Sequence, residues 1–193
     1  MKAVKLLFAA LAMSFAMNAS AEGGRWTFDV KFGSVERPYF DWDTGFEWSD
    51  RSAGFGLGVG YQKDIKEFNN WTLAWDVVSF DYAAPFSSPA KADYLALRTG
   101  LRLFTPTFWG DKCRCYVNAA PGYSCLLWKE VEQQYWGNGI LLGVDESMKA
   151  HHGFGLSVGV GFQFMEKYSI GYTLQYETAG KTKSHFATLG WSF

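Results

Sequence analysis

The residues closest to a catalytic set are Glu177, Ser184 and His185, which lie around the last turn-rich segment of the chain. An acid, a hydroxyl and an imidazole can activate serine as a nucleophile when all three side chains share one surface. Alternate residues of a strand face opposite ways, which turns Glu177 and Ser184 inward and His185 outward beside Tyr176. We therefore predict no catalytic residues and a non-enzymatic protein.

Two further groups resemble metal ligands without completing a site. His151 and His152 are adjacent, so their side chains diverge across a sheet and a metal would rarely use both. The segment 41–47 alternates carboxylates at Asp41, Asp43 and Glu47 but lacks the full ligand set of a calcium loop. We predict no metal and no cofactor, with these residues facing water at the rim.

The three cysteines, Cys113, Cys115 and Cys125, are too few for a disulfide framework and leave at least one thiol unpaired. Cys113 and Cys115 lie two positions apart on one strand face, where a bridge would be strained. We expect free or loosely paired thiols.

The N-terminus has the pattern of a secretory signal peptide. Lys2 and Lys5 precede an apolar run over residues 6–17, which ends in Asn18-Ala19-Ser20-Ala21, an A-x-A cleavage site. We predict a signal peptide over residues 1–21 and one domain over residues 22–193. With 18 basic and 19 acidic residues, the chain shows no basic patch for nucleic acid.

The domain contains eight runs in which every second residue is apolar or aromatic, which is a period of two. These runs centre on residues 26–32, 55–61, 71–77, 95–103, 117–123, 154–164, 168–176 and 187–193. Each run covers about 9 to 12 residues, enough for a tilted strand to cross a bilayer core. The predicted fold is all-β, an eight-stranded antiparallel up-and-down transmembrane β-barrel.

The predicted connections alternate in length, as they do in an up-and-down barrel whose N-terminus is periplasmic. Long outer connections are expected at 34–53, 81–93 and 129–150. Shorter ones are expected at 63–69, 104–113, 165–167 and 178–183, of which the last is short for an outer loop.

Glycine rows decide which strand face is lipid-facing. Gly54, Gly56, Gly58 and Gly60 fill the face opposite the apolar residues of one run, and 153–161 repeats the pattern. Small side chains suit the crowded interior of a narrow barrel, so the apolar face points to lipid and ends in aromatic girdles.

The same alternation points three acidic and three basic side chains into the bore: Asp29, Lys31, Asp76, Arg98, Arg102 and Glu177. A hairpin in which residue 81 opposes residue 93 would make Asp76 and Arg98 direct cross-strand partners. Buried charges need partners, so we interpret this set as a plug that fills the bore; a narrow ion path is the alternative.

The outer connections are unusually aromatic, and exposed aromatic clusters commonly mark contact surfaces. The candidate contact residues for an extracellular ligand are Tyr39, Phe40, Trp42, Phe46, Trp48, Tyr135 and Trp136. Packing of these loops on one another is the competing interpretation.

The chain ends in Leu189, Trp191 and Phe193, spaced two apart. With the signal peptide and eight alternating runs, this ending resembles the small outer-membrane barrels of the OmpX and opacity-protein type. The resemblance implies a bacterial outer-membrane location, contact with outer-membrane lipid and lipopolysaccharide, and recognition of this ending by the barrel-assembly machinery. It implies no activity.

Two alternatives remain open at this point. A lipid A-modifying barrel enzyme, an acyl hydrolase or transferase, would need a surface triad, and the sequence lacks the His-x-Ser spacing of such deacylases. A secreted lipocalin-like or avidin-like barrel is suggested by Gly24-Arg25-Trp26 as a G-x-W motif.

Overall fold

The structure, a computed structural model, describes residues 24–40, 47–86, 93–135 and 141–193. Only the backbone is described for residues 37–40, 47–50, 128–135 and 141–148. The strands are β1 (Gly24–Phe40), β2 (Glu47–Phe68), β3 (Trp71–Pro85), β4 (Asp93–Phe104), β5 (Cys113–Tyr135), β6 (Leu141–Phe164), β7 (Tyr168–Glu177) and β8 (Thr182–Ser192). Within these described ranges, no helix is long and apolar enough to cross a membrane.

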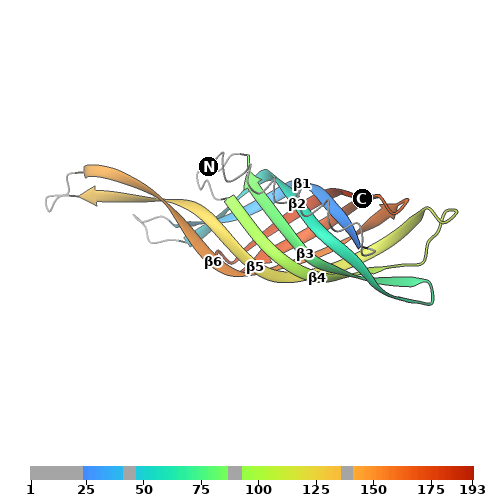
Figure 1. The fold of residues 1–193 in the computed structure, drawn as a ribbon. Coiled ribbons are helices and arrows are strands. Elements are labelled where there is room, and N and C mark those ends of the chain that lie inside the picture. The colour runs from blue at the N-terminus through green and yellow to red at the C-terminus, as the bar shows by residue number, and fades with distance from the viewer. Residues whose placement is uncertain (1–23, 41–46, 87–92, 136–140) are drawn as a thin grey trace.

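The strands form a closed antiparallel barrel in sequence order, and β1 pairs with β8 to complete it (Figure 1). The last residue helps to close this seam. Trp26 donates its backbone N–H to the carbonyl of Phe193 at 2.8 Å, and Phe193 donates in return to the carbonyl of Trp26 at 2.9 Å. The predicted eight-stranded barrel is confirmed.

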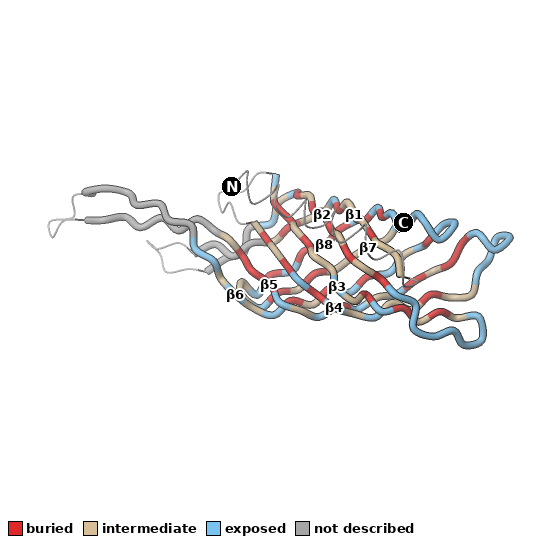
Figure 2. Tube along the Cα trace, viewed as in Figure 1, coloured by how far each residue is buried: buried red, intermediate tan, exposed pale blue. Residues whose placement is uncertain are grey.

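Side chains alternate between the two faces of the sheet, and Figure 2 shows this as buried and exposed residues in turn along each strand. The outward residues are large and apolar and remain accessible: Phe32, Leu97, Leu101, Val117, Phe154, Val160, Phe162 and Leu189. The inward face carries glycine, hydroxyl, amide and charged side chains. This partition is the reverse of a soluble ligand-binding barrel, whose apolar residues point inward.

One end of the barrel, the terminal end, holds the start of β1, the end of β8 and three short connections. The β2–β3 turn there consists of Asn69 and Asn70, whose φ angles are 48° and 64°. Two consecutive positive φ values define the type I′ turn, which suits the twist of a two-residue hairpin.

The opposite end, the hairpin end, corrects the predicted strand lengths. β5 and β6 span 23 and 24 residues, well beyond 9 to 12, and their ribbon projects far from the barrel (Figure 1). β1 and β2 stay paired to Phe40 and Glu47, although β1 leaves β8 at Ser34. Much of the predicted connections 34–53 and 129–150 is therefore strand, because hydrogen-bonded pairs continue past the closed part of the sheet.

The glycine row of β2 gives a direct test of the packed bore. A Cβ on Gly58 would lie 2.7 Å from Asp81 Oδ1 and 3.4 Å from Lys31 Nζ. We predict that Gly58→Val prevents folding or lowers stability by about 1–3 kcal/mol, the usual cost of overpacking.

Leu57→Val is the matched control, because Leu57 is the neighbouring outward residue and is 39% exposed. Urea titration of protein refolded in detergent, followed by the mobility shift on unheated gels, measures both variants. Equal stability of the two would contradict the packing described.

Candidate functional site

The interior of the barrel is built in three layers, which the inward face of β4 shows in order. From the hairpin end, Tyr94 and Ala96 come first, Arg98 and Arg102 follow, and Phe104 is last. The first layer is an apolar cluster of Val35, Ala83, Tyr94, Ala96, Leu126 and Phe186, and the last consists of Ala74, Phe104 and Tyr116. The charged layer therefore lies between two apolar layers.

Asp81 is the centre of the charged layer. Its two oxygens accept separately, Oδ1 from the Lys31 ammonium and Oδ2 from the Arg98 guanidinium. All three side chains are buried, and Arg98 also donates to the hydroxyl of Tyr94. One carboxylate thus joins β1, β3 and β4, which satisfies charges that would be costly if buried alone.

A second chain of contacts runs from this layer toward the terminal end. Arg102 pairs with Asp76 at 3.3 Å, and Asp76 accepts from Gln62 Nε2 at 2.8 Å. Arg25 donates to Gln62 Oε1 at 2.9 Å and pairs with Asp64 at 2.5 Å. Charges of alternating sign are thereby linked through one buried amide.

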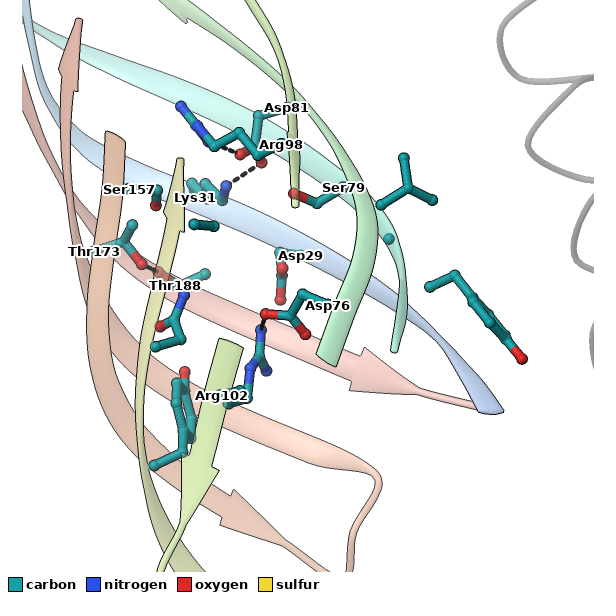
Figure 3. A pocket seen from close by; sticks show the side chains of 16 residues that line it. Asp29, Lys31, Asp76, Ser79, Asp81, Arg98, Arg102, Ser157, Thr173 and Thr188 are labelled. Atoms are coloured by element: carbon teal, nitrogen blue, oxygen red, sulfur yellow. Dashed lines mark hydrogen bonds and ion pairs between the residues drawn. The ribbon is translucent and has the colours of Figure 1, made fainter. Parts of the chain in front are cut away.

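A cavity of about 50 Å³ lies between the contacts of Asp81 and those of Asp76, and Asp29 points into it (Figure 3). This volume holds a few water molecules at most. Among the described residues, no ion pair joins Asp29, although Lys31 and Arg102 line the same cavity. The bore therefore contains a small polar void beside the charged layer.

Glu177 is inward and buried, but it contacts neither the Asp81 group nor the Asp76 group of side chains. Its Oε1 accepts from the Thr182 hydroxyl at 3.0 Å and from the Gly180 backbone N–H at 2.9 Å. It therefore stabilises the β7–β8 turn.

The predicted pairing of Asp76 with Arg98 is wrong. Asp76 lies opposite Gly100 and Arg98 lies opposite Ser79, because a β-bulge interrupts the β3–β4 ladder. The bulge turns both Val77 and Val78 outward, so inward residues change from even to odd numbers along β3.

This bulge also explains why sequence reasoning missed Asp81. Simple alternation ended the third run near Val77 and assigned residue 81 to a connection. The structure continues β3 to Pro85 and places Asp81 inside. The signal that could have found it was an acidic residue four positions beyond the end of the predicted run at Val77, in a chain whose predicted interior already held the bases Lys31 and Arg98.

The remaining predicted residues occupy the outer face or the hairpin end. Leu189, Trp191 and Phe193 are exposed on the outer face. Tyr39, Phe40, Trp48 and Tyr135 lie in strands with only their backbone described, while Trp42, Phe46 and Trp136 lie outside the described residues.

The predicted serine and histidine, Ser184 and His185, lie on opposite faces of the barrel wall. Ser184 is buried inside, whereas His185 faces outward and bonds to Tyr172, not to the predicted neighbour Tyr176. His152 faces outward against Tyr123. All three cysteines are free thiols, and no cluster of three His, Cys, Asp or Glu suited to a metal occurs among the described residues.

No protein-family model and no curated protein matches this chain. Solved structures do. Neisserial surface protein A is 14% identical, covers 89% of this chain and 96% of its own, and superposes with a TM-score of 0.51. The outer membrane enzyme PagL is 13% identical, with 87% and 98% covered and a TM-score of 0.51.

The N-terminal β-barrel domain of Pseudomonas aeruginosa OprF is 14% identical, covers 87% of this chain and 97% of its own, and has a TM-score of 0.49. The likeness to the first two structures confirms the predicted fold class, a small eight-stranded barrel of the outer-membrane type. This likeness shows the fold alone, since one of the two structures is an enzyme and the other is a surface protein.

The geometry of Asp81 predicts an asymmetry between two interior carboxylates. Asp81→Asn leaves Lys31 and Arg98 buried without their counter-charge and should cost about 3–5 kcal/mol of stability. Asp29→Asn removes a carboxylate that has no ion pair and should cost less than about 1 kcal/mol. Urea unfolding of the refolded variants measures both losses, and a larger loss for Asp29→Asn would contradict this assignment.

Proposed function

We propose that the protein is an integral barrel of a bacterial outer membrane whose bore is closed, so that its role is carried by its surfaces. The observation that supports this most strongly is the charged layer between two apolar layers, with a cavity of about 50 Å³ as its void. In this proposal the six interior charges Asp29, Lys31, Asp76, Arg98, Arg102 and Glu177 have a structural, non-enzymatic role.

The outer face supports a membrane location, because large apolar side chains cover it while the polar side chains point inward. The terminal end, with its short turns, would face the periplasm, and the hairpin end would face outward. Lipid and lipopolysaccharide would then contact the apolar outer face. The barrel-assembly machinery would recognise Leu189, Trp191 and Phe193 at the edge of that face.

A closed bore predicts no steady conductance. Purified full-length protein, inserted as a monomer into planar lipid bilayers, should give no stable single-channel current above the bare membrane. Insertion is verified by the gel-mobility shift of protein recovered from vesicles of the same lipid. Reproducible current steps from the folded monomer would refute the closed bore.

We also propose that the hairpin end contacts an extracellular ligand. The β1–β2 and β5–β6 ribbons carry paired backbone well beyond the closed barrel, and their sequences hold the aromatic residues Tyr39, Phe40, Trp42, Phe46, Trp48, Tyr135 and Trp136. Aromatic clusters on a protein surface commonly mark contact sites.

Replacing the five aromatic residues of 39–48 with serine should reduce adherence of expressing bacteria to a cultured epithelial monolayer to the level of cells without the protein. The barrel should remain folded, because β1–β8 pairing ends at Ser34, before the replaced segment. Adherence unchanged by the replacement, or absent from the unaltered protein, would contradict this part of the proposal.

A further inference from the structure

A polar group interrupts the apolar outer face at the seam between β1 and β8. Along β1, Phe32 is outward and 51% exposed while Val35 is inward and fully buried, so Ser34 and Glu36 take the next outward positions. On β8, Lys183 and His185 are outward between buried Thr182, Ser184 and Phe186. Ser34, His185 and Glu36 thus share the outer surface. Glu177 and Ser184, in contrast, lie on the inner face and do not share a surface with His185.

His185 is held from the β7 side. Its Nδ1 hydrogen-bonds to the hydroxyl of Tyr172, and the two ring centroids are 6.1 Å apart. Nδ1 and Nε2 flank Cε1 in the imidazole ring. The Tyr172 contact is made at Nδ1 and therefore leaves Nε2 free of this hydrogen bond.

Ser34 lies on the β1 side of His185. It is the direct cross-strand partner of His185 and the last pair of the β1–β8 ladder. Side chains of directly opposed residues on one face have Cβ atoms about 4.5–5.5 Å apart, a separation that rotation of the two side chains can close to a hydrogen bond between a serine hydroxyl and Nε2. The arrangement of a hydroxyl, a base and a group that orients the base is the pattern of an activated nucleophile.

The surroundings of this pair are amphipathic. Toward the terminal end, Phe32 and Leu189 are exposed and apolar. Toward the hairpin end, Glu36 accepts from the Lys183 backbone N–H at 3.0 Å and lies 3.6 Å from Arg51, whose side chain is largely exposed, as is Lys183. Ser34 and His185 thus lie at the boundary between the apolar outer face and a charged rim in which Lys183 and Arg51 flank the single carboxylate of Glu36.

We propose that Ser34 and His185 form a hydrolytic site for acyl esters of membrane amphiphiles with an anionic headgroup. The acyl chain would lie along the apolar outer face at Phe32 and Leu189, and the headgroup would lie near Lys183 and Arg51. This orientation places the ester at the boundary, beside Ser34.

The reaction proceeds in two halves. His185 Nε2 takes the Ser34 hydroxyl proton as Oγ bonds to the ester carbonyl carbon; the carbon–oxygen bond to the alcohol then breaks, and the alcohol leaves with that proton. Water next attacks the acyl-Ser34 ester, giving its proton to His185. The acyl–Oγ bond breaks, the fatty acid leaves, and the proton returns to Ser34.

This inference goes beyond the closed barrel proposed above and departs from the expectation of a non-enzymatic protein. The acid and the serine nearest to His185 in the sequence, Glu177 and Ser184, are buried inside the barrel. Ser34 comes beside His185 only when the barrel closes, so no sequence pattern joins them.

A second tyrosine–histidine pair on the outer face supplies a control. His152 Nδ1 also bonds to a tyrosine hydroxyl, that of Tyr123, with ring centroids 5.8 Å apart. Its direct cross-strand partner is Cys125, on the same strand as Tyr123. On the other side the β6–β7 ladder ends at Gly155 and Glu177, so no serine of β7 is paired with His152. His152→Ala should therefore leave hydrolysis unchanged.

The test uses the folded full chain in mixed micelles with phosphatidylglycerol, and fatty acid release is the readout. Ser34→Ala and His185→Ala should each lower kcat at least 100-fold, and a fluorophosphonate probe should label Ser34 in the unaltered protein and in His152→Ala but leave Ser34→Ala unlabelled. Tyr172 acts through His185 as a positioning residue, so Tyr172→Phe should lower kcat with KM unchanged. The gel-mobility shift verifies that each variant is folded.

Two results would overturn the proposal. One is folded unaltered protein that neither releases fatty acid from phosphatidylglycerol or from purified lipopolysaccharide nor reacts with the probe. The other is hydrolysis that Ser34→Ala leaves intact or that His152→Ala removes. Neither result bears on the closed bore, which the conductance measurement tests separately.

Discussion

The ion pairs that Asp81 makes with Lys31 and Arg98 set the constraint on which the rest of the interior depends. Three charges lie out of water, and a buried charge is tolerated only when its partners are close and well oriented. The contacts therefore fix the positions of β1, β3 and β4 relative to one another along the barrel axis. They also require that no side chain project from β2 at Gly58, where a Cβ would lie 2.7 Å from Asp81 Oδ1.

The same constraint explains the partition between the two faces. An eight-stranded barrel has little interior space, so glycine, hydroxyl and paired charged side chains fill it and the large apolar side chains point outward. The apolar layers at Phe186 and Phe104 then lie on either side of the Asp81 ion pairs. An interior built in this way leaves the outer face and the hairpin end as the surfaces available for function.

The sequence predicts the strands, their number and most inward residues, because a period of two directly encodes which side chains share a face. It could not predict the bulge at Val77 and Val78, since one extra residue leaves the apolar pattern of β3 nearly unchanged while it reverses the parity that brings Asp81 inside. The lengths of β5 and β6 were also missed, because polar ribbons beyond the barrel do not alternate. Contacts across the β1–β8 seam, such as that of Ser34 with His185, depend on closure alone.

In the proposed closed barrel, the interior charges serve to pack one another. The most direct measurement compares the unfolding free energies of Asp81→Leu and of the triple variant Lys31→Met, Asp81→Leu and Arg98→Met in the same detergent. Removing all three charges leaves no buried charge of this cluster unpaired, so the triple variant should be more stable than the single one by about 2 kcal/mol or more. A triple variant that is less stable than Asp81→Leu would contradict the claim.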